Sequence, residues 1–292
     1  MTASKPRCQL IGAGRAGRVL ALAMARAGYS FTWIGSLHRD HAESLAGAIG
    51  CTGYGEGFMG FTGTADFLVI AVPDNQIAPV ASGAATAGII GDETIVAHLS
   101  GALGSDTLDE ARTAGASVMA FHPDQTLTPE SDPETVFEGI CIDMEGDERA
   151  CLFGEQLASD LGAKSVRLTP DQRILTHLAM TIASNFTVSL VRIAEEIMES
   201  AGIDDTTVHT MLMPLFKQTA RNIAESGTLT ALTGPIARGD DGVVRRHLSA
   251  LESQDEEYTV LYKAMARVIV RMAVERGEDF DERAFDWFLR DG

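Results

Sequence analysis

The chain opens with an apolar segment that runs directly into a glycine-rich turn and then into a pattern of helical period. The apolar segment covers residues 8–11, and the turn reads GAGRAG. In such a turn Gly12 permits a tight bend, Gly14 lets the backbone approach a pyrophosphate, and Gly17 lets helix and strand pack closely. The helix N-terminus adds unpaired N–H groups and partial positive charge. A dinucleotide-binding βαβ unit is therefore predicted, with contacts from Gly12, Ala13, Gly14, Arg15, Ala16 and Gly17.

The rest of the first half alternates short apolar runs with helical patterns, which predicts an α/β fold with a doubly wound parallel Rossmann sheet over residues 1–168. Several runs are continuously apolar and bounded by Gly, Pro or Asp, as in strands covered on both faces. The predicted strands are 8–11, 31–34, 67–72, 94–99, 117–121, 140–144 and 165–168. The glycine-rich stretch 50–63 is predicted to be a mobile loop.

Beyond Pro170 the pattern becomes entirely helical, which predicts an all-α second domain over residues 169–292. The helical segments are 171–201, 206–226, 243–253 and 258–276. The most apolar stretch, 174–194, contains His177, Asn185 and Arg192, so we interpret it as a buried helix rather than a membrane span.

Composition narrows the class of protein. Asp and Glu number 41 against 23 Lys and Arg, a formal net charge of −18. Such a chain repels phosphate backbones and anionic lipid surfaces, so no nucleic-acid or membrane partner is expected. The four cysteines are scattered without a CxxC pair, and no secretory segment precedes the first strand, which favours a reducing, cytoplasmic location. No metal site is predicted.

The end of the second predicted strand bears on the choice of cofactor. An NAD-binding sheet usually carries an acid there for the ribose 2′-hydroxyl, but this chain has Ser36, followed by Arg39. Both can bind a 2′-phosphate, which favours NADP over NAD, although Arg39 is also compatible with an ordinary solvated charge. After a later strand, Val72 and Pro73 are expected to flank the nicotinamide ribose.

Three further segments carry candidates for substrate chemistry. Ser100 and His122 follow two predicted strands, whose ends face the crevice of the sheet. His177 and Asn185 share a polar stripe, with Thr181 and Ser184, on an otherwise apolar helix, which favours a polar cavity over a helix–helix contact. A compact turn offers Thr233, Gly234 and Arg238 to a carboxylate, or is a structural loop.

Taken together, the motifs GAGRAG, AVPDNQI, HLSGALGSDTL, FHPDQT and ALTGPIARGD resemble proteins that join a Rossmann-like domain to the domain of unknown function DUF2520. That family is similar to pyrroline-5-carboxylate reductase, β-hydroxyacid dehydrogenases and ketopantoate reductase. The resemblance implies an NADPH-dependent reductase with a helical C-terminal domain, like that of 6-phosphogluconate dehydrogenase, that forms a homodimer.

One position departs from the related enzymes. In β-hydroxyacid dehydrogenases and the usual ketopantoate reductase, a catalytic lysine stands four residues before a substrate-binding asparagine. Asn185 fits the asparagine, but position 181 is threonine. His122 or His177 is therefore expected to supply the proton, while Ser100 or the Thr233–Arg238 turn binds a carboxylate.

Three functions remain open from the sequence. The first is hydride transfer from NADPH to a small 2-oxo acid, with ketopantoate the best single candidate. The second is an imine or pyrroline reductase that uses the same pocket. The third is a sensor or scaffold protein that binds NADP without chemistry, a possibility that the missing lysine raises.

Overall fold

A computed structural model describes residues 5–128, 130–277, 280 and 282–289. The chain divides into two compact units, Met1–Ser184 and Asn185–Gly292. The division falls one helix later than the sequence boundary at 168, because helix α6 (Pro170–Ala183) is held to the first unit by buried contacts of Arg173. Each unit is described by itself.

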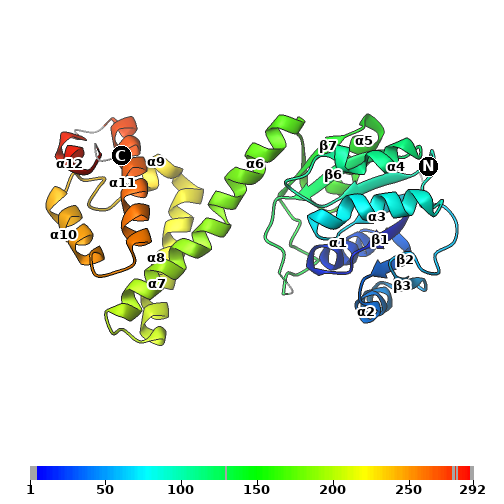
Figure 1. Ribbon diagram of the computed structural model, residues 1–292, viewed down its shortest axis with the longest axis horizontal. Helices are drawn as coiled ribbons and strands as arrows, with labels where there is room; N and C mark the ends of the chain where they lie inside the picture. The colour runs from blue at the N-terminus through cyan, green and yellow to red at the C-terminus, as the bar shows by residue number, and fades with distance from the viewer. Residues whose placement is uncertain (1–4, 129, 278–279, 281, 290–292) are drawn as a thin grey trace. The chain divides into compact units, whose positions relative to one another are not determined.

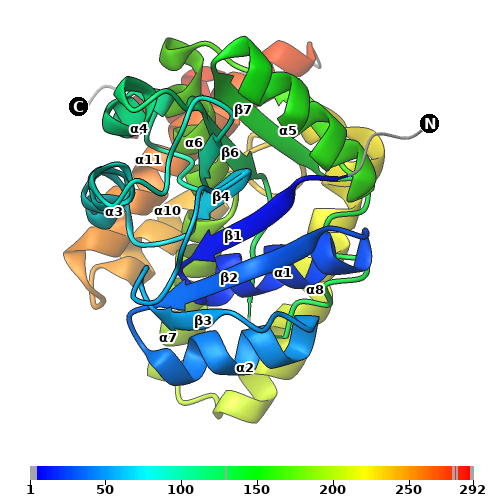
Figure 2. The ribbon, with the colours of Figure 1, turned by 90° about the vertical axis from the view of Figure 1, so that its right-hand side faces the viewer.

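The first unit contains an eight-stranded sheet in the order β3-β2-β1-β4-β5-β6-β7-β8 (Figures 1 and 2). The doubly wound Rossmann arrangement predicted from the sequence is confirmed. The strands are β1 (Arg7–Ile11), β2 (Ser30–Ser36), β3 (Tyr54–Glu56), β4 (Phe67–Ile70), β5 (Ile95–His98), β6 (Ser117–Pro123), β7 (Cys141–Gly146) and β8 (Lys164–Arg167).

Helices cover both faces of this sheet (Figure 2). On one face α1 (Arg15–Arg26), α2 (Arg39–Ile49) and α5 (Glu148–Asp160) bury their apolar sides in one cluster. On the other, α3 (Asp74–Thr86) and α4 (Asp109–Thr113), with the short 3₁₀ turn η1 (Ser105–Leu108), bury a second cluster. Burial on both faces explains why strands such as β4 are apolar throughout.

Strands β6 and β7 pair antiparallel, whereas the other neighbours in the sheet are parallel. Between these two strands the described residues, 124–128 and 130–140, form no helix to carry the chain back across the sheet, and a parallel neighbour would need such a crossover. The amino end of β7 therefore lies beside the carboxyl end of β6, and His122 pairs in register with Asp143.

The glycine-rich stretch 50–63, predicted from the sequence to be a mobile loop, contributes β3 and packs on Trp33. The Trp33 Nε1 donates to the carbonyl of Gly57 at 2.8 Å. A Cβ on Gly55 would stand 2.9 Å from the indole Cζ2, so glycine is needed for this close approach. Gly53, Gly55 and Gly60 therefore serve packing against Trp33.

The second unit is helical, as the sequence predicts. Its helices are α7 (Asn185–Ser200), α8 (Asp205–Ser226), α9 (Thr228–Ala231), α10 (Asp241–Leu251), α11 (Glu256–Arg276) and α12 (Asp286–Leu289), with the 3₁₀ turn η2 (Glu282–Phe285). A small core includes Ile236, Val244, Ala266 and Val270. Asp204 begins α8 by accepting a hydrogen bond from the Thr207 amide at 3.1 Å.

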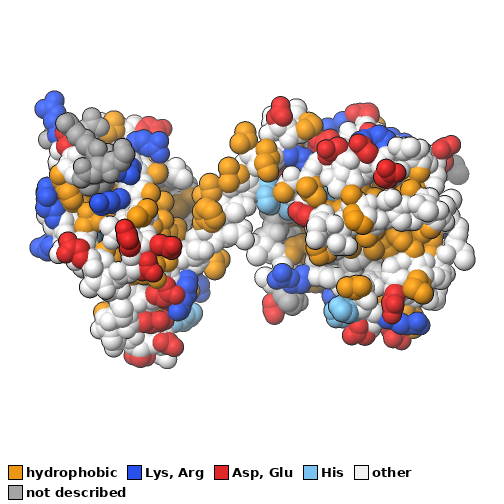
Figure 3. Space-filling view, viewed as in Figure 1, with side chains coloured by type: hydrophobic (Ala, Val, Ile, Leu, Met, Phe, Trp, Pro, Cys, Tyr) orange, Lys and Arg blue, Asp and Glu red, His pale blue; other side chains and the backbone are white. Residues whose placement is uncertain are grey.

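The interpretation of residues 174–194 as a buried helix is wrong for this chain. Ile174, Leu178 and Ile182, spaced four residues apart along α6, are 54%, 50% and 52% exposed. Hydrophobic side chains gather on α6 in Figure 3. The segment Pro170–Ser200 is long and apolar enough to cross a membrane, but a single helix of this kind is weak evidence for a membrane span. The spacing of apolar residues shows that they share one face of a helix, but it does not show what covers that face.

Candidate active site

The glycine turn between β1 and α1 has the geometry that its three glycines predict. Gly12 has φ of +108°, and a Cβ there would stand 2.1 Å from the carbonyl oxygen of Ala71. A Cβ on Gly17 would meet the Gly12 oxygen at 2.0 Å. By contrast, nothing lies within 4 Å of the Cβ position of Gly14, the N-terminal cap of α1. An open cradle at a helix N-terminus fits a dinucleotide pyrophosphate.

Val72 and Pro73 lie next to this turn. The Val72 Cγ1 would be 3.2 Å from a Cβ on Gly12, so the two loops are in contact. Pro73 is the N-terminal cap residue of α3, with φ of −53° and ψ of 146°. Both residues follow β4, the direct neighbour of β1 in the sheet. They therefore stand at the carboxyl edge, where the sequence places the nicotinamide ribose.

The residues that the sequence predicts to contact a 2′-phosphate lie at the end of β2 and just after it. Ser36 is 6% exposed, and its Oγ accepts a long hydrogen bond from the His38 amide at 3.4 Å. The Arg39 guanidinium lies over the ring of Tyr54, 5.5 Å from the centroid. A pocket of about 360 Å³ is lined by Arg39, Glu56 and neighbouring residues. These groups offer a stacking surface and a cation to an adenosine phosphate.

A second basic pocket, of about 630 Å³, adjoins the glycine turn. Arg15, Arg18 and His41 line it, together with Gly14. Arg18 is 3.4 Å from the hydroxyl of Ser44. Arg15 is thus positioned beside the turn, as predicted, and shares its surroundings with two further basic side chains.

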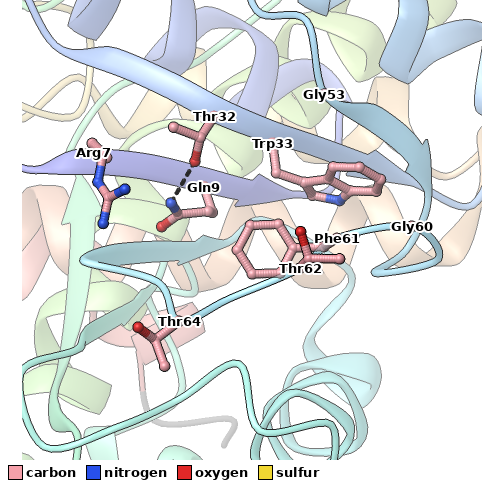
Figure 4. A pocket seen from close by; sticks show the side chains of 9 residues that line it. All are labelled: Arg7, Gln9, Thr32, Trp33, Gly53, Gly60, Phe61, Thr62 and Thr64. Atoms are coloured by element: carbon pink, nitrogen blue, oxygen red, sulfur yellow. Dashed lines mark hydrogen bonds between the residues drawn. The ribbon is translucent and has the colours of Figure 1, made fainter.

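A pocket of about 250 Å³ lies away from this edge, along the amino-terminal half of β1 (Figure 4). The Gln9 amide and the Thr32 hydroxyl are hydrogen-bonded at 2.6 Å, and Arg7 is paired with Asp66 at 2.9 Å. The rings of Trp33 and Phe61 pack edge to face. Because these polar groups already have protein partners, we assign this pocket no ligand.

The loop after β5 is organised by its own side chains. Fully buried His98 contacts the carbonyl of Gly104 through Nε2 at 3.0 Å, and its Nδ1 accepts from the Ser100 amide at 3.2 Å. The Ser100 Oγ accepts from the amides of Ala102 and Leu103. Burial lowers the pKa of His98. His98 is therefore structural, and Ser100 has a turn-forming role that leaves its hydroxyl proton free to donate.

His122 and His177 are brought together although they are far apart in sequence. His122 ends β6 and His177 lies on α6, and their ring centroids are 5.9 Å apart. The His122 Nδ1 donates to the carbonyl of Leu99 at 2.9 Å, which leaves Nε2 for other partners. A Cβ on Gly101 would lie 2.8 Å from this Nε2 and 2.5 Å from the His177 Cδ2. Both rings thus close over Gly101.

Three charged residues that the sequence did not single out surround His122. Asp143 and Arg173 form a close ion pair, and their side chains are 4% and 1% exposed. Arg173 also donates to the carbonyls of Ser100 and Leu103. Asp124 follows β6, and its Oδ1 is buried without a hydrogen-bond partner among the described residues. The FHPDQT motif contained Asp124, but the antiparallel pairing that brings Asp143 to it has no signature in sequence.

The pKa values of His122 and Asp124 in this cluster are shifted from their ordinary values. Burial lowers the pKa of His122, and the positive charge of Arg173 acts in the same direction. Burial raises the pKa of Asp124 to about 7, and the charge of Asp143 adds to that rise. Near neutral pH a proton is thus held more readily by Asp124 than by the imidazole.

The remaining predicted residues belong to the second unit. Asn185 begins α7 and its side chain is exposed. Thr233 and Arg238 are also exposed, in the loop before α10, where Gly234 has φ of +102°. Asp240, two residues after Arg238, caps α10 by accepting from the Val243 amide. The roles of Asn185, Thr233, Gly234 and Arg238 stay predictions.

Fold and topology together define a Rossmann domain followed by a helical domain. Residues 2–123 match the Rossmann-like domain model, and residues 140–269 match the domain of unknown function DUF2520. The chain therefore carries a Rossmann-like N-terminal domain followed by a DUF2520 domain, as its motifs predict.

Solved structures agree with this assignment. A provisionally named NADP oxidoreductase from Bacteroides fragilis is 25% identical, with a TM-score of 0.75 over 91% of this chain and 98% of that one. A Thermotoga maritima protein, also 25% identical, has a TM-score of 0.73 over 93% and 100%. An imine reductase from Myxococcus stipitatus, in complex with NADP⁺, shares the fold at 18% identity, with a TM-score of 0.63 over 97% and 100%. No functionally curated protein matches the sequence.

Proposed function

We propose that this protein is an NADPH-dependent reductase that transfers a hydride to a C=O or C=N carbon of a small substrate. One observation carries the proposal: the glycine turn, Val72 and the His122 cluster lie at one edge of a single sheet. The turn follows β1, Val72 follows β4, and His122 stands near the end of β6, and these three strands lie within four neighbouring strands. Such an edge places a dinucleotide and titratable groups in the same crevice.

NADPH would bind through the residues whose geometry fits it. The amides of the turn at Gly14 would hold the pyrophosphate, and Arg39, with Ser36, would hold the 2′-phosphate. The cofactor supplies the hydride. The chain's own residues would orient the substrate and manage one proton, because reduction of C=O or C=N takes up one proton for each hydride.

Two substrate classes are proposed for the same crevice. A small 2-oxo acid, with ketopantoate tested first, would use Asn185 to orient its carbonyl. Its carboxylate would be bound by Ser100 or by the turn containing Thr233, Gly234 and Arg238. A cyclic imine is the second class, favoured by threonine at position 181 and by a neutral carboxyl group at Asp124. An imine nitrogen can be protonated before hydride transfer and needs no strong acid.

The test follows NADPH absorbance with purified protein and ketopantoate, with pyrroline-5-carboxylate and NADH in parallel wells. Oxidation with ketopantoate alone would support the 2-oxo acid class, and oxidation with pyrroline-5-carboxylate the imine class. Tight NADPH binding without consumption in either well would contradict the reductase proposal and favour a sensor or scaffold.

We also propose that a second copy of the chain covers the exposed stripe on α6, in a cytoplasmic homodimer. Ile174, Leu178 and Ile182 are each about half exposed, which is costly for a stripe of this length in water. The mass in solution tests this proposal: a monomer at micromolar concentration would reject it. Leu178→Glu is expected to shift the mass toward the monomer, whereas Glu195→Gln, on α7, is not.

A further inference from the structure

His122, Asp124 and Asp143 form a compact cluster at the edge of the sheet. One ring nitrogen and one oxygen from each carboxylate lie within 4.8 Å of one another. Asp143 stands opposite His122 in the antiparallel register, and Asp124 follows two residues after His122. The titratable and charged groups that face this cluster come from β6 and its loop, from β7, and from α6, which contributes Arg173 and His177.

The two carboxylates of this cluster are not equivalent. Asp143 has its countercharge in the buried guanidinium of Arg173. The remaining contacts of Arg173 go to the carbonyls of Ser100 and Leu103, so this cation is already engaged. Asp124 is within hydrogen-bonding reach of Asp143, while its Oδ1 is buried without a partner among the described residues. If Asp124 were ionised, a second buried negative charge would stand beside the first.

Protonation of one carboxyl group removes the repulsion between the two negative charges without a further cation. Two carboxyl groups in contact, with only one compensating charge between them, favour the state in which one is ionised and the other protonated. Asp143 takes the ionised role because Arg173 is fixed against it. Asp124 then keeps the proton, and burial together with the charge of Asp143 supports this assignment.

We propose that Asp124 and Asp143 share one proton and that this pair is the proton reserve for the reduction. The inference rests on the proposed reductase function. The Asp124 carboxyl gives its proton, through water beside His122, to a carbonyl oxygen during hydride transfer to the substrate carbon, or to an imine nitrogen before that transfer. Asp124 becomes a carboxylate and regains a proton from solvent, so one hydride and one proton are consumed in each turnover.

His122 has a positioning role in this scheme. With Nδ1 donating to Leu99, the neutral ring offers Nε2 as a hydrogen-bond acceptor that can orient the transferring water. Spans of up to 4.8 Å within the cluster are short enough for one water to bridge. The neutral ring, not an imidazolium, is therefore the resting form that the reaction uses.

The first experiment is a titration of the aspartate side-chain carboxyl carbons by NMR in the full-length protein, assigned through the backbone. Asp124 is expected to titrate near neutrality, and Asp143 to sense the same event. Asp204, whose pKa is lowered by hydrogen bonds from Thr207, serves as the internal control and should titrate at lower pH. Titration of Asp124 together with Asp204 would overturn the proposal. This readout needs neither a variant nor a substrate.

The second experiment compares NADPH oxidation by the wild type, Asp124→Asn and Asp171→Asn as a function of pH. Ionisation of Asp124 above neutral pH is expected to lower the activity of the wild type. Asp124→Asn is expected to lower kcat about 100-fold or more with NADPH affinity unchanged, and to remove this dependence on pH. Asp171→Asn should match the wild type. An unchanged pH profile in folded Asp124→Asn protein would overturn the proton reserve.

The two experiments distinguish failure of the shared-proton proposal from failure of the proposed reductase function. A neutral titration midpoint in a protein that oxidises NADPH with no carbonyl or imine would establish the shared proton but overturn the reductase function, and with it the catalytic use of the pair. Reductase activity with an ordinary Asp124 titration would leave the reductase standing and overturn the pair.

Discussion

Arg173 of α6 and Asp143 of β7 form an ion pair in which both side chains are almost completely buried. Arg173 also donates to the carbonyl of Leu103 at 3.1 Å and to that of Ser100. One side chain thus joins the helix that carries His177, the loop after β5 and the strand beside His122. The pair holds together the segments that form the candidate site.

Removal of one partner should be costly. Arg173→Met would leave the Asp143 carboxylate buried without its cation, so we expect the free energy of unfolding to fall by about 3–5 kcal/mol. Arg167→Met removes exposed ion pairs with Glu148 and Glu155 and is the matched control, with a much smaller expected loss. Urea unfolding of both variants checks this, and equal losses would contradict a structural role for the buried pair.

Gly101 lets the two histidine rings approach each other. Gly101→Ala would place a Cβ 2.5 Å from the His177 Cδ2, so at least one ring must shift. Because displacements near 1 Å can cost about 100-fold in rate, we expect a large fall in kcat from a protein that still folds. Gly91→Ala meets only a Thr64 methyl at 3.8 Å and should be nearly silent. Steady-state kinetics and melting temperatures separate the two variants.

Alanine substitutions at two glycines of the glycine turn should have different effects. Gly14→Ala adds a methyl group where no protein atom lies within 4 Å, so the melting temperature should hold while NADPH affinity falls by about tenfold or more. Gly12→Ala is strained by its positive φ and meets the Ala71 oxygen, so the fold itself should be weakened. Calorimetry and cofactor titration test both variants. Unchanged NADPH affinity in Gly14→Ala would exclude this turn as the binding cradle.

Arg39 should set the preference between the two nicotinamide cofactors. A charge-assisted bond to a 2′-phosphate contributes about 1.5–3 kcal/mol, so Arg39→Gln should weaken NADPH binding about tenfold or more and leave NADH binding nearly unchanged. Arg26→Gln changes an exposed arginine on α1 and should alter neither affinity. A parallel loss for NADPH and NADH would instead assign Arg39 to stacking on adenine, in line with its place over Tyr54.

The sequence predicted the parts of this molecule that depend on local chemistry. The glycine turn is such a part: a Cβ on Gly12 or Gly17 would clash with backbone atoms, and the space beside Gly14 is open. The pairing of Asp143 with His122 could not be predicted, because it depends on an antiparallel register between strands whose described connecting residues form no crossover helix. Arg173 was missed for a related reason: nothing local distinguishes a buried helical arginine from a solvated one. Exposure of the apolar stripe on α6 likewise depends on what surrounds the helix.

Asp124 should give the stability of the protein an unusual pH dependence. Its pKa of about 7 in the folded state exceeds the ordinary value of 3.8, so between roughly pH 4 and pH 7 the folded chain binds more protons at this site than the unfolded chain. The stability that Asp124 contributes must therefore fall as pH rises through that window. The lowered pKa of His122 acts with the opposite sign, because the unfolded chain binds the proton more readily there.

The difference in unfolding free energy between the wild type and Asp124→Asn isolates the carboxyl group, since the other titrating groups largely cancel. We expect this difference to decline steadily from pH 4 to pH 7. Urea titrations of both proteins at one-unit intervals of pH measure it. A flat difference for Asp124→Asn would mean that Asp124 is ionised throughout the window. A positive charge besides that of Arg173 would then be needed to offset the two buried carboxylates of Asp124 and Asp143.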